Sequence, residues 1–168
     1  VLPSNRLGDA CIQELRKFGV DTRKIQRGSG RMGIYFLESG ANQLPSKVIY
    51  DRADSALSLA QPGSVDWDSV LSGAGWFHIT GITPAISRSA MDLSMEAVKA
   101  AKGRGLTVSC DLNYRKNLWN YGLKASEVMS KLTEYVDVAI ANEEDIQKSL
   151  GITGDIQVGS GHLERDAY

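Results

Sequence analysis

The spacing of apolar positions changes along the chain, and each spacing predicts a different element. Over residues 4–18 apolar side chains recur every three or four positions, which predicts a helix capped by Ser4 and ended by Gly19. The apolar face of this helix would carry Leu7, Cys11, Leu15 and Phe18. Residues 31–38 and 46–52 alternate with a period of about two, and the turn-forming residues between them predict a β-hairpin.

From Asp66 onward, short apolar runs alternate with segments of helical period. We expect strands at 76–80, 106–112 and 136–141. We expect helices from the break at residues 81–84 to about 102, around 127–135, and from 142 to 151, the first with Met91, Met95 and Val98 facing inward. Alternation at this spacing indicates βαβ units, and therefore an α/β fold with a parallel sheet flanked by helices. Residues 1–30 and 60–168 would form one incomplete domain, and residues 31–59 an inserted hairpin too small to bury a core alone.

Composition narrows the class of protein. The chain has 168 residues, a formal net charge of −1 and interspersed charges, which argues against a nucleic-acid or membrane-surface binder. No apolar run approaches the roughly 18 residues of a membrane span, and residues 1–6 lack the features of a signal peptide. The two cysteines, Cys11 and Cys110, have no metal-ligand spacing, so we expect core thiols in a reducing cytoplasm.

The hairpin would sort its side chains onto two faces. Symmetric closure places Tyr35 opposite Tyr50, Leu37 opposite Val48, and Gly33 opposite Arg52. A guanidinium between two phenols suits a small hydroxylated acid, because arginine forks onto a carboxylate while tyrosines donate to oxygens. The alternative is an edge hairpin with paired tyrosines and a solvated arginine. The opposite face is apolar and would need a partner; it would carry Met32, Ile34, Phe36 and Ile49.

Two further segments combine polar and helix-starting features. Residues 111–119 (Asp-Leu-Asn-Tyr-Arg-Lys-Asn-Leu-Trp) follow a predicted strand, at the end where doubly wound sheets bind ligands, although a simple loop with a core-covering Trp119 fits as well. Asn142 precedes three carboxylates, a pattern typical of a helix N-cap. His78 lies in an apolar strand and is interpreted as a core residue, whereas His162 has no evident partner.

Three glycine-rich segments carry no assigned chemistry. The segments 28–30 and 159–161 lack the Lys-Ser/Thr of a phosphate-binding loop and are interpreted as flexible connectors. Gly73-Ala74-Gly75 is followed by Trp76 and precedes a strand, so it is not a Gly-Ala-Gly-Asp motif.

Taken together, these segments resemble the PfkB (ribokinase-type) sugar kinases, most closely the 2-keto-3-deoxygluconate kinases. Residues 31–38 with 46–53 resemble the substrate lid of that family, and residues 111–119 resemble its Asp-x-Asn-x-Arg loop with the following Leu-Trp. Residues 142–145 resemble its Asn-x-x-Glu motif, with Asp145 in place of the glutamate. The resemblance implies a ribokinase-like fold with a hairpin lid.

The resemblance also implies roles for individual residues. The sugar acid would be held by Tyr35, Tyr50, Arg52 and Arg115. The phosphates of ATP would lie near Asn113, Arg115 and Asn142. Mg²⁺ would bridge the phosphates, but no residue of this chain is assigned as its ligand, and the shorter Asp145 leaves a magnesium role for that position open.

The implied reaction is transfer of the ATP γ-phosphoryl group to the terminal hydroxyl of 2-keto-3-deoxygluconate, giving the 6-phosphate. The apolar hairpin face suggests a homodimer whose lids pack together. No catalytic residue is assigned here, because the family's Gly-Ala-Gly-Asp aspartate and amino-terminal Gly-Gly strand are not found in the sequence, and we expect the chain alone to be inactive. One rival is a fructokinase or ribokinase, whose neutral sugar offers Arg52 no carboxylate. The others are a non-catalytic sugar-acid binding module and a fragment that folds only in part.

Overall fold

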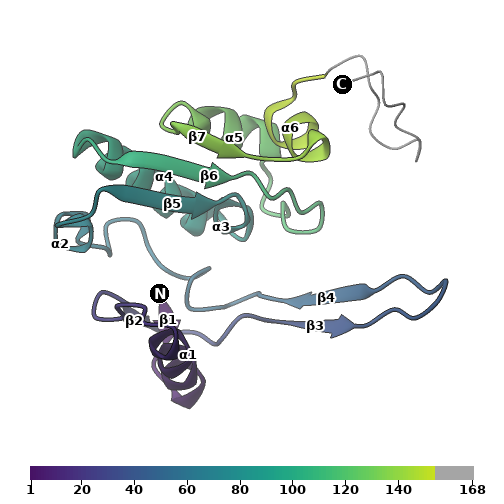
Figure 1. Ribbon diagram of the computed structural model, residues 1–168, viewed down its shortest axis with the longest axis horizontal. Coiled ribbons are helices and arrows are strands. Elements are labelled where there is room, and N and C mark those ends of the chain that lie inside the picture. Colours follow the sequence, from purple (N-terminus) through teal and green to yellow (C-terminus); the bar gives the residue numbers. More distant parts are fainter. Residues whose placement is uncertain (154–168) are drawn as a thin grey trace. The chain divides into compact units, whose positions relative to one another are not determined.

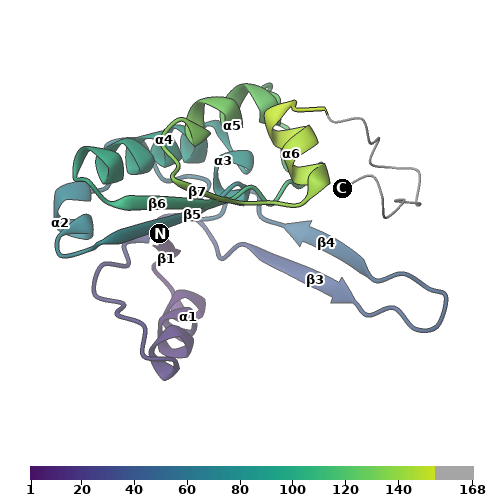
Figure 2. The same cartoon turned by 45° about the horizontal axis from the view of Figure 1, so that its top comes forward.

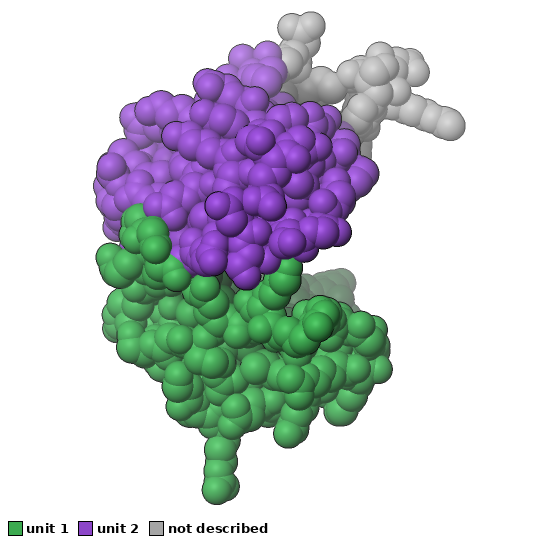
Figure 3. Space-filling model, turned by 90° about the vertical axis from the view of Figure 1, so that its left-hand side faces the viewer, with its two compact units in different colours: residues 1–64 green, residues 65–168 purple. Residues whose placement is uncertain are grey.

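The computed structural model describes residues 1–153 and divides the chain into two compact units. Unit 1 comprises residues 1–64 and unit 2 begins at residue 65; Figure 3 shows them in green and purple. The grouping of residues 1–30 with 60–168 in one domain stays a prediction.

Unit 1 begins with a short strand and a helix. Strand β1 (Leu2–Pro3) pairs in parallel with β2 (Arg27–Gly28), and helix α1 (Arg6–Lys17) lies between them in sequence. The predicted cap was wrong by one residue: the side chain of Asn5, not of Ser4, accepts from the N–H groups of Leu7 and Gly8, each over 3.1 Å. Asparagine and serine cap equally well, so adjacent candidates are not separated by composition.

The contact of α1 with β1 uses a glycine rather than the predicted apolar face. A Cβ added to Gly8 would lie 2.2 Å from the carbonyl oxygen of Pro3, so only glycine allows this approach. Gly8 is the buried residue of the helix, whereas Leu7 and Phe18 are 62% and 79% exposed. The predicted end at Gly19 is confirmed, since Gly19 has φ +74° and its N–H donates to the carbonyl of Arg16.

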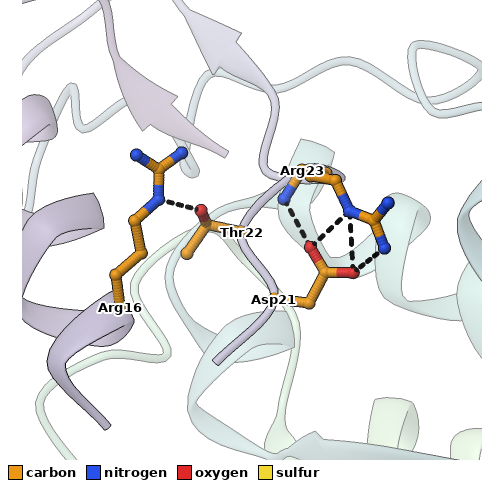
Figure 4. Close-up of polar contacts among 4 residues, drawn as sticks. All are labelled: Arg16, Asp21, Thr22 and Arg23. Atoms are coloured by element: carbon orange, nitrogen blue, oxygen red, sulfur yellow. Dashed lines mark hydrogen bonds and ion pairs between the residues drawn. The ribbon is translucent and has the colours of Figure 1, made fainter. Parts of the chain in front are cut away.

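Side chains fix the return of the chain after α1 (Figure 4). Arg16 Nε donates to Thr22 Oγ1 over 2.7 Å, which ties the last turn of the helix to the following segment. The guanidinium and backbone N–H of Arg23 both donate to the Asp21 carboxylate, and these bonds hold the pKa of that carboxyl well below its usual range. The chain is thereby directed toward β2.

The predicted hairpin is present in unit 1, where it extends as a two-stranded ribbon (Figure 1). Strands β3 (Ile34–Glu38) and β4 (Lys47–Asp51) pair antiparallel in the predicted register, with Tyr35 opposite Tyr50 and Leu37 opposite Val48. All five residues of β3 are exposed, so the ribbon has no core of its own within unit 1.

Unit 2 is a three-stranded parallel sheet covered by helices on one face (Figures 1 and 2). The strands are β5 (Trp76–Thr80), β6 (Thr107–Asp111) and β7 (Val138–Ile140), in the order β5-β6-β7. The helices are α2 (Trp67–Leu71), α3 (Ile82–Ala85), α4 (Arg88–Gly103), α5 (Ala125–Thr133) and α6 (Glu143–Leu150). The predicted strands and main helices are confirmed; α2, α3 and the short β1–β2 pair were not predicted.

The core of unit 2 lies between the sheet and helices α4 and α5. Val108 and Cys110 of β6 are fully buried there, together with Val98 of α4 and Met129 and Leu132 of α5. The predicted inward face of α4 is confirmed, because Met91 and Val98 are buried and Met95 packs against the core. Burial raises the pKa of the Cys110 thiol to about 12.

The other face of the sheet is open within unit 2. By strand alternation Trp76, Val138 and Ile140 share this face, and they are 57%, 41% and 53% exposed. His78 lies on it as well, so its assignment to the core was wrong. The imidazole nevertheless has a partner, since Nδ1 lies 2.8 Å from Ser109 Oγ.

The glycine segment 28–30 is not a free connector. Gly28 pairs with Pro3, and Gly30 has φ +95° at a point where an added Cβ would lie 2.7 Å from the Asp54 carbonyl oxygen. The segment 159–161 and His162 lie outside the described residues. None of the helices within residues 1–153 is long and apolar enough to cross a membrane.

Candidate functional site

The loop after β6 starts at the carboxyl end of the central strand. Leu112 N–H donates to the Ile140 carbonyl of β7 over 2.9 Å, and Asn113 Nδ2 donates to Thr80 Oγ1 of β5 over 3.4 Å. Asn113 has φ +41°, a conformation that asparagine tolerates better than most residues. The first residues of the loop are thus tied to both neighbouring strands.

Gly81 brings the end of β5 against this loop. Its N–H donates to the Asp111 carbonyl over 2.8 Å, and an added Cβ would lie 2.1 Å from the Leu112 carbonyl oxygen. Any side chain at position 81 would force the backbones apart, so this glycine sets the position of Asn113 indirectly.

Asp145 joins the loops that follow β6 and β7. Its side chain is buried, Oδ1 accepts from Tyr114 N–H over 2.7 Å, and Oδ2 accepts from Asn142 N–H over 3.2 Å. Asn142 Oδ1 accepts in return from Asp145 N–H over 2.8 Å, which completes a reciprocal cap of α6. One carboxylate therefore holds both of the sequence segments predicted to face the nucleotide.

The predicted helix-capping interpretation of residues 142–145 is confirmed, and the sequence did not reveal the bond from Asp145 to the other loop. Both carboxylate oxygens of Asp145 accept from backbone N–H groups, so the residue positions the two loops. Within residues 1–153 no three His, Cys, Asp or Glu side chains gather as metal ligands would. The Asn-x-x-Asp spacing signals the cap, but only the strand order brings Tyr114 to it.

Arg115 presents an exposed guanidinium from an anchored backbone. Its carbonyl accepts from Leu118 N–H over 3.0 Å, and its Nη1 makes only a long 3.4 Å bond to the Tyr114 carbonyl. Beyond it, Tyr121 OH donates to the Pro84 carbonyl over 2.6 Å, and burial raises the pKa of Tyr121 to about 12. Among the described residues no carboxylate pairs with Arg115, which leaves its charge available to an anion.

The hairpin brings the three predicted sugar-acid residues together on one face. Tyr35 lies directly opposite Tyr50, and the guanidinium carbon of Arg52 lies 4.9 Å from the centre of the Tyr50 ring. The space beside Gly33 is bordered by Arg52 and Ser55, since a Cβ added there would lie 3.5 Å from Arg52 Cγ and 3.3 Å from Ser55 Cβ. Within residues 1–153 no ion pair engages the Arg52 guanidinium.

A second arginine fixes the base of the hairpin. Both Nη atoms of Arg31 donate to the Asp51 carboxylate, and Nε donates to the Ala53 carbonyl over 2.9 Å. The backbone of Arg31 also bonds to Asp54 and Ala56. The hydrogen bonds from the Arg31 guanidinium lower the pKa of Asp51. Arg31 neutralises Asp51 on the face opposite Arg52, so Arg52 keeps its positive charge uncompensated by that carboxylate.

The candidate residues fall into two groups. Tyr35, Tyr50 and Arg52 belong to unit 1 and share one hairpin face. Asn113, Arg115 and Asn142 belong to unit 2, at the carboxyl ends of its parallel strands. In doubly wound sheets this edge is where ligands bind.

Comparisons with known proteins identify the family of the chain. A profile described as "pfkB family carbohydrate kinase" matches residues 1–163. The chain belongs to the pfkB family of carbohydrate kinases. The predicted family and the ribokinase-like α/β fold are therefore confirmed.

Individual relatives of this pfkB chain are sugar-acid kinases. The chain is 36% identical over 165 residues to 2-dehydro-3-deoxygalactonokinase of Haloferax volcanii, covering 98% of this chain and 51% of that protein. It is 34% identical over 154 residues to 2-dehydro-3-deoxygluconokinase of Thermoproteus tenax, covering 88% and 45%.

A solved structure agrees. The crystal structure of 2-dehydro-3-deoxygluconokinase from Thermotoga maritima superposes with a TM-score of 0.88 at 52% identity, over 99% of this chain and 49% of that one. The pfkB chain thus spans about half the length of the relatives it matches.

Proposed function

We propose that the protein containing this chain phosphorylates a 2-keto-3-deoxy sugar acid, with 2-keto-3-deoxygluconate as the preferred substrate and its 6-phosphate as the product. The observation that carries the proposal is the Arg52 guanidinium, stacked on Tyr50 and unpaired among the described residues. A neutral sugar would leave that charge without a partner, whereas a sugar acid supplies a carboxylate. Similarity to kinases of two such acids supports the same substrate class.

The hairpin would hold the acid end of the substrate. Arg52 would donate two parallel hydrogen bonds to the carboxylate. Because the guanidinium already stacks on Tyr50, it would lose less conformational entropy when the substrate binds. Tyr35 and Tyr50 would donate to sugar oxygens from the same face. The missing side chain at Gly33 lets its backbone lie close to Arg52 and Ser55.

Unit 2 would hold the phosphates of ATP. Arg115 offers an exposed positive charge, and Asn113 and Asn142 place polar amides at neighbouring strand ends, a donor set that fits the phosphates of ATP. Arg115 would offset negative charge as the phosphoryl group moves, while the Asp145 bonds keep both loops fixed. Mg²⁺ bound to the phosphates would neutralise them further, and we assign it no ligand in this chain.

The other hairpin face would bind a second copy of the protein. Ile34, Phe36 and Ile49 are 39%, 55% and 53% exposed on one face, an apolar surface that pairing of two lids would bury. Light scattering should then report a dimer, and Phe36→Lys should shift it toward monomer. The cytoplasm is the proposed location, consistent with the unpaired thiols of Cys11 and Cys110.

The test is ADP release by the complete reading frame that contains this chain. Substrates would be 2-keto-3-deoxygluconate, 2-keto-3-deoxygalactonate, gluconate, fructose and ribose. We expect selective turnover of the keto-deoxy acids. Arg52→Ala should lower kcat/KM by roughly 10- to 100-fold through loss of a charge-assisted bidentate contact. Arg115→Ala should lower kcat as well, because its contact strengthens as charge moves.

Controls separate the possible outcomes. Arg23→Ala removes another exposed arginine of unit 1 that pairs with Asp21 and should leave kinetics unchanged. Turnover of fructose or ribose in place of the acids would retain the kinase and overturn the role of Arg52. Binding of the acid without ADP release would indicate a sugar-acid binding module instead.

A further inference from the structure

Unit 2 contains a cavity of about 320 Å³ between the loop after β6 and the start of α5. Its lining includes Lys116 and Trp119 from the loop, Lys124 and Ser126 at the start of α5, and Lys148 from the last turn of α6. Arg115, the proposed phosphate contact, is not among the lining residues, whereas its neighbours Tyr114 and Lys116 are. Its volume is at the lower end for small-molecule sites.

The charge of the lining is positive throughout. Three lysines border the cavity, and no aspartate or glutamate is among its lining residues. Within residues 1–153 none of Lys116, Lys124 and Lys148 forms an ion pair. The nearest carboxylate on α5, Glu127, accepts from the backbone N–H of Lys124 rather than from its ammonium group. Like charges placed together without counter-ions favour binding of an anion.

Neutral donors without acceptors border the same cavity. At the start of α5 the Glu127 side chain accepts from the Lys124 N–H, whereas the N–H groups of Ala125 and Ser126 bond to no acceptor within the described part of the chain. Trp119 Nε1 is buried and likewise has no hydrogen-bond partner there. Unpaired N–H groups at a helix N-terminus can donate to a bound anion, and an indole N–H adds another donor.

We propose that this cavity is a second anion site of the protein, and that it binds a small phosphate-bearing molecule. The cavity offers three ammonium groups, two backbone N–H groups and one indole N–H as donors. A carboxylate has only two oxygens to accept from them, whereas a phosphate group has more oxygens and can accept from several donors at once. Trp119 and Leu123 also line the cavity and give the organic part of the ligand an apolar wall.

Nuclear magnetic resonance titration with inorganic phosphate tests this site directly. The ¹⁵N-labelled chain would be titrated at constant ionic strength maintained with chloride. We expect saturable shifts of the Trp119 indole N–H and of the Ala125 and Ser126 amides. The indoles of Trp67 and Trp76 are internal references, since they already donate to Glu96 and Ser109, and should not move.

Matched lysine variants give the second measurement. Lys124→Gln and Lys148→Gln should each weaken phosphate binding by roughly three- to tenfold, the loss of one partly screened charge-assisted contact. Lys131→Gln lies on α5 outside the cavity and should leave the affinity unchanged. A titration without saturation, equal shifts of all three indoles, or an equal loss in Lys131→Gln would each overturn the site. None of these readouts depends on kinase activity.

Discussion

The hairpin of unit 1 and the parallel sheet of unit 2 are both built from short strands, but they are held in different ways. The sheet packs fully buried side chains such as Val108 and Met129 against helices. The hairpin exposes every residue of β3 and is fixed mainly by its register and by Arg31 at its base. A region held by packing tolerates little change in side-chain volume, whereas a region held by register tolerates much and depends on a few polar contacts.

The sharpest expected contrast is between the two cysteines. Cys110 lies buried in the sheet, and its pKa of about 12 leaves little thiolate at pH 8. It should react with a thiol reagent roughly a thousandfold more slowly than an unperturbed thiol, while the half-buried Cys11 of unit 1 reacts first. Labelling followed by peptide mapping checks this. Rapid modification of Cys110 in the native chain would show that the core of unit 2 opens easily.

Truncation of a large side chain should separate the regions next. Met129→Ala removes a fully buried side chain and should lower the free energy of unfolding by about 2–5 kcal/mol. In the monomer, Phe36→Ala removes a 55% exposed side chain of the hairpin and should change the free energy of unfolding by less than about 0.5 kcal/mol. Urea unfolding of both variants gives the comparison. Equal losses would mean that the hairpin is packed as firmly as the sheet.

A smaller loss of unfolding free energy is expected when the polar contacts of Asp145, beside the sheet of unit 2, are removed. Asp145→Ala leaves the N–H groups of Tyr114 and Asn142 without their acceptor and should cost about 2 kcal/mol of unfolding free energy. Hydrogen exchange at Tyr114 should become faster. Glu144→Ala, at an exposed position in the same helical turn, is the control, and a cost no smaller than that of Asp145→Ala would contradict the role of Asp145.

The smallest effect concerns pH. Hydrogen bonds from Lys102 and from the backbone N–H of Val108 lower the pKa of Asp137 in unit 2, and bonds from Arg31 lower that of Asp51 in the hairpin. A carboxyl with a lowered folded-state pKa stabilises above its unfolded pKa, and this contribution is lost as pH falls through the folded value.

Acid titration of the two matched variants distinguishes the regions. Asp137→Asn should make global stability less dependent on pH below about 5. Asp51→Asn should change amide exchange in the hairpin and leave global unfolding nearly as before, because β3 buries no residue. If the unfolding free energies of wild type and Asp137→Asn vary with pH in parallel, Asp137 does not contribute to the acid sensitivity.

The sequence predicted most of the fold where local pattern and packing agree. The strand at 76–80 matches β5, and the hairpin register follows from a symmetric turn. The β1–β2 pair has two residues per strand, too few for any period to appear. His78 was placed in the core because its strand is apolar, but alternation turns it to the face that unit 2 leaves open.

The candidate site could be predicted as segments but not as contacts. Residues 111–119 and 142–145 stand out by composition, yet their connection through Asp145 depends on β6 and β7 being neighbours. The cavity lined by lysines 116, 124 and 148 was missed for the same reason, since its residues come from three separate elements. Long-range proximity of this kind has no periodic signature in one sequence.

The bond between Asp145 and Tyr114 also bears on the order of events during synthesis. The two residues are 31 positions apart, so the ribosome adds 31 residues before the loop that carries Arg115 acquires its acceptor. At typical elongation rates this interval is roughly 2 to 6 seconds. During it, Tyr114 N–H and the adjacent arginine remain open to water and to chaperones, and the nascent chain acquires the fixed form of this loop only when α6 emerges.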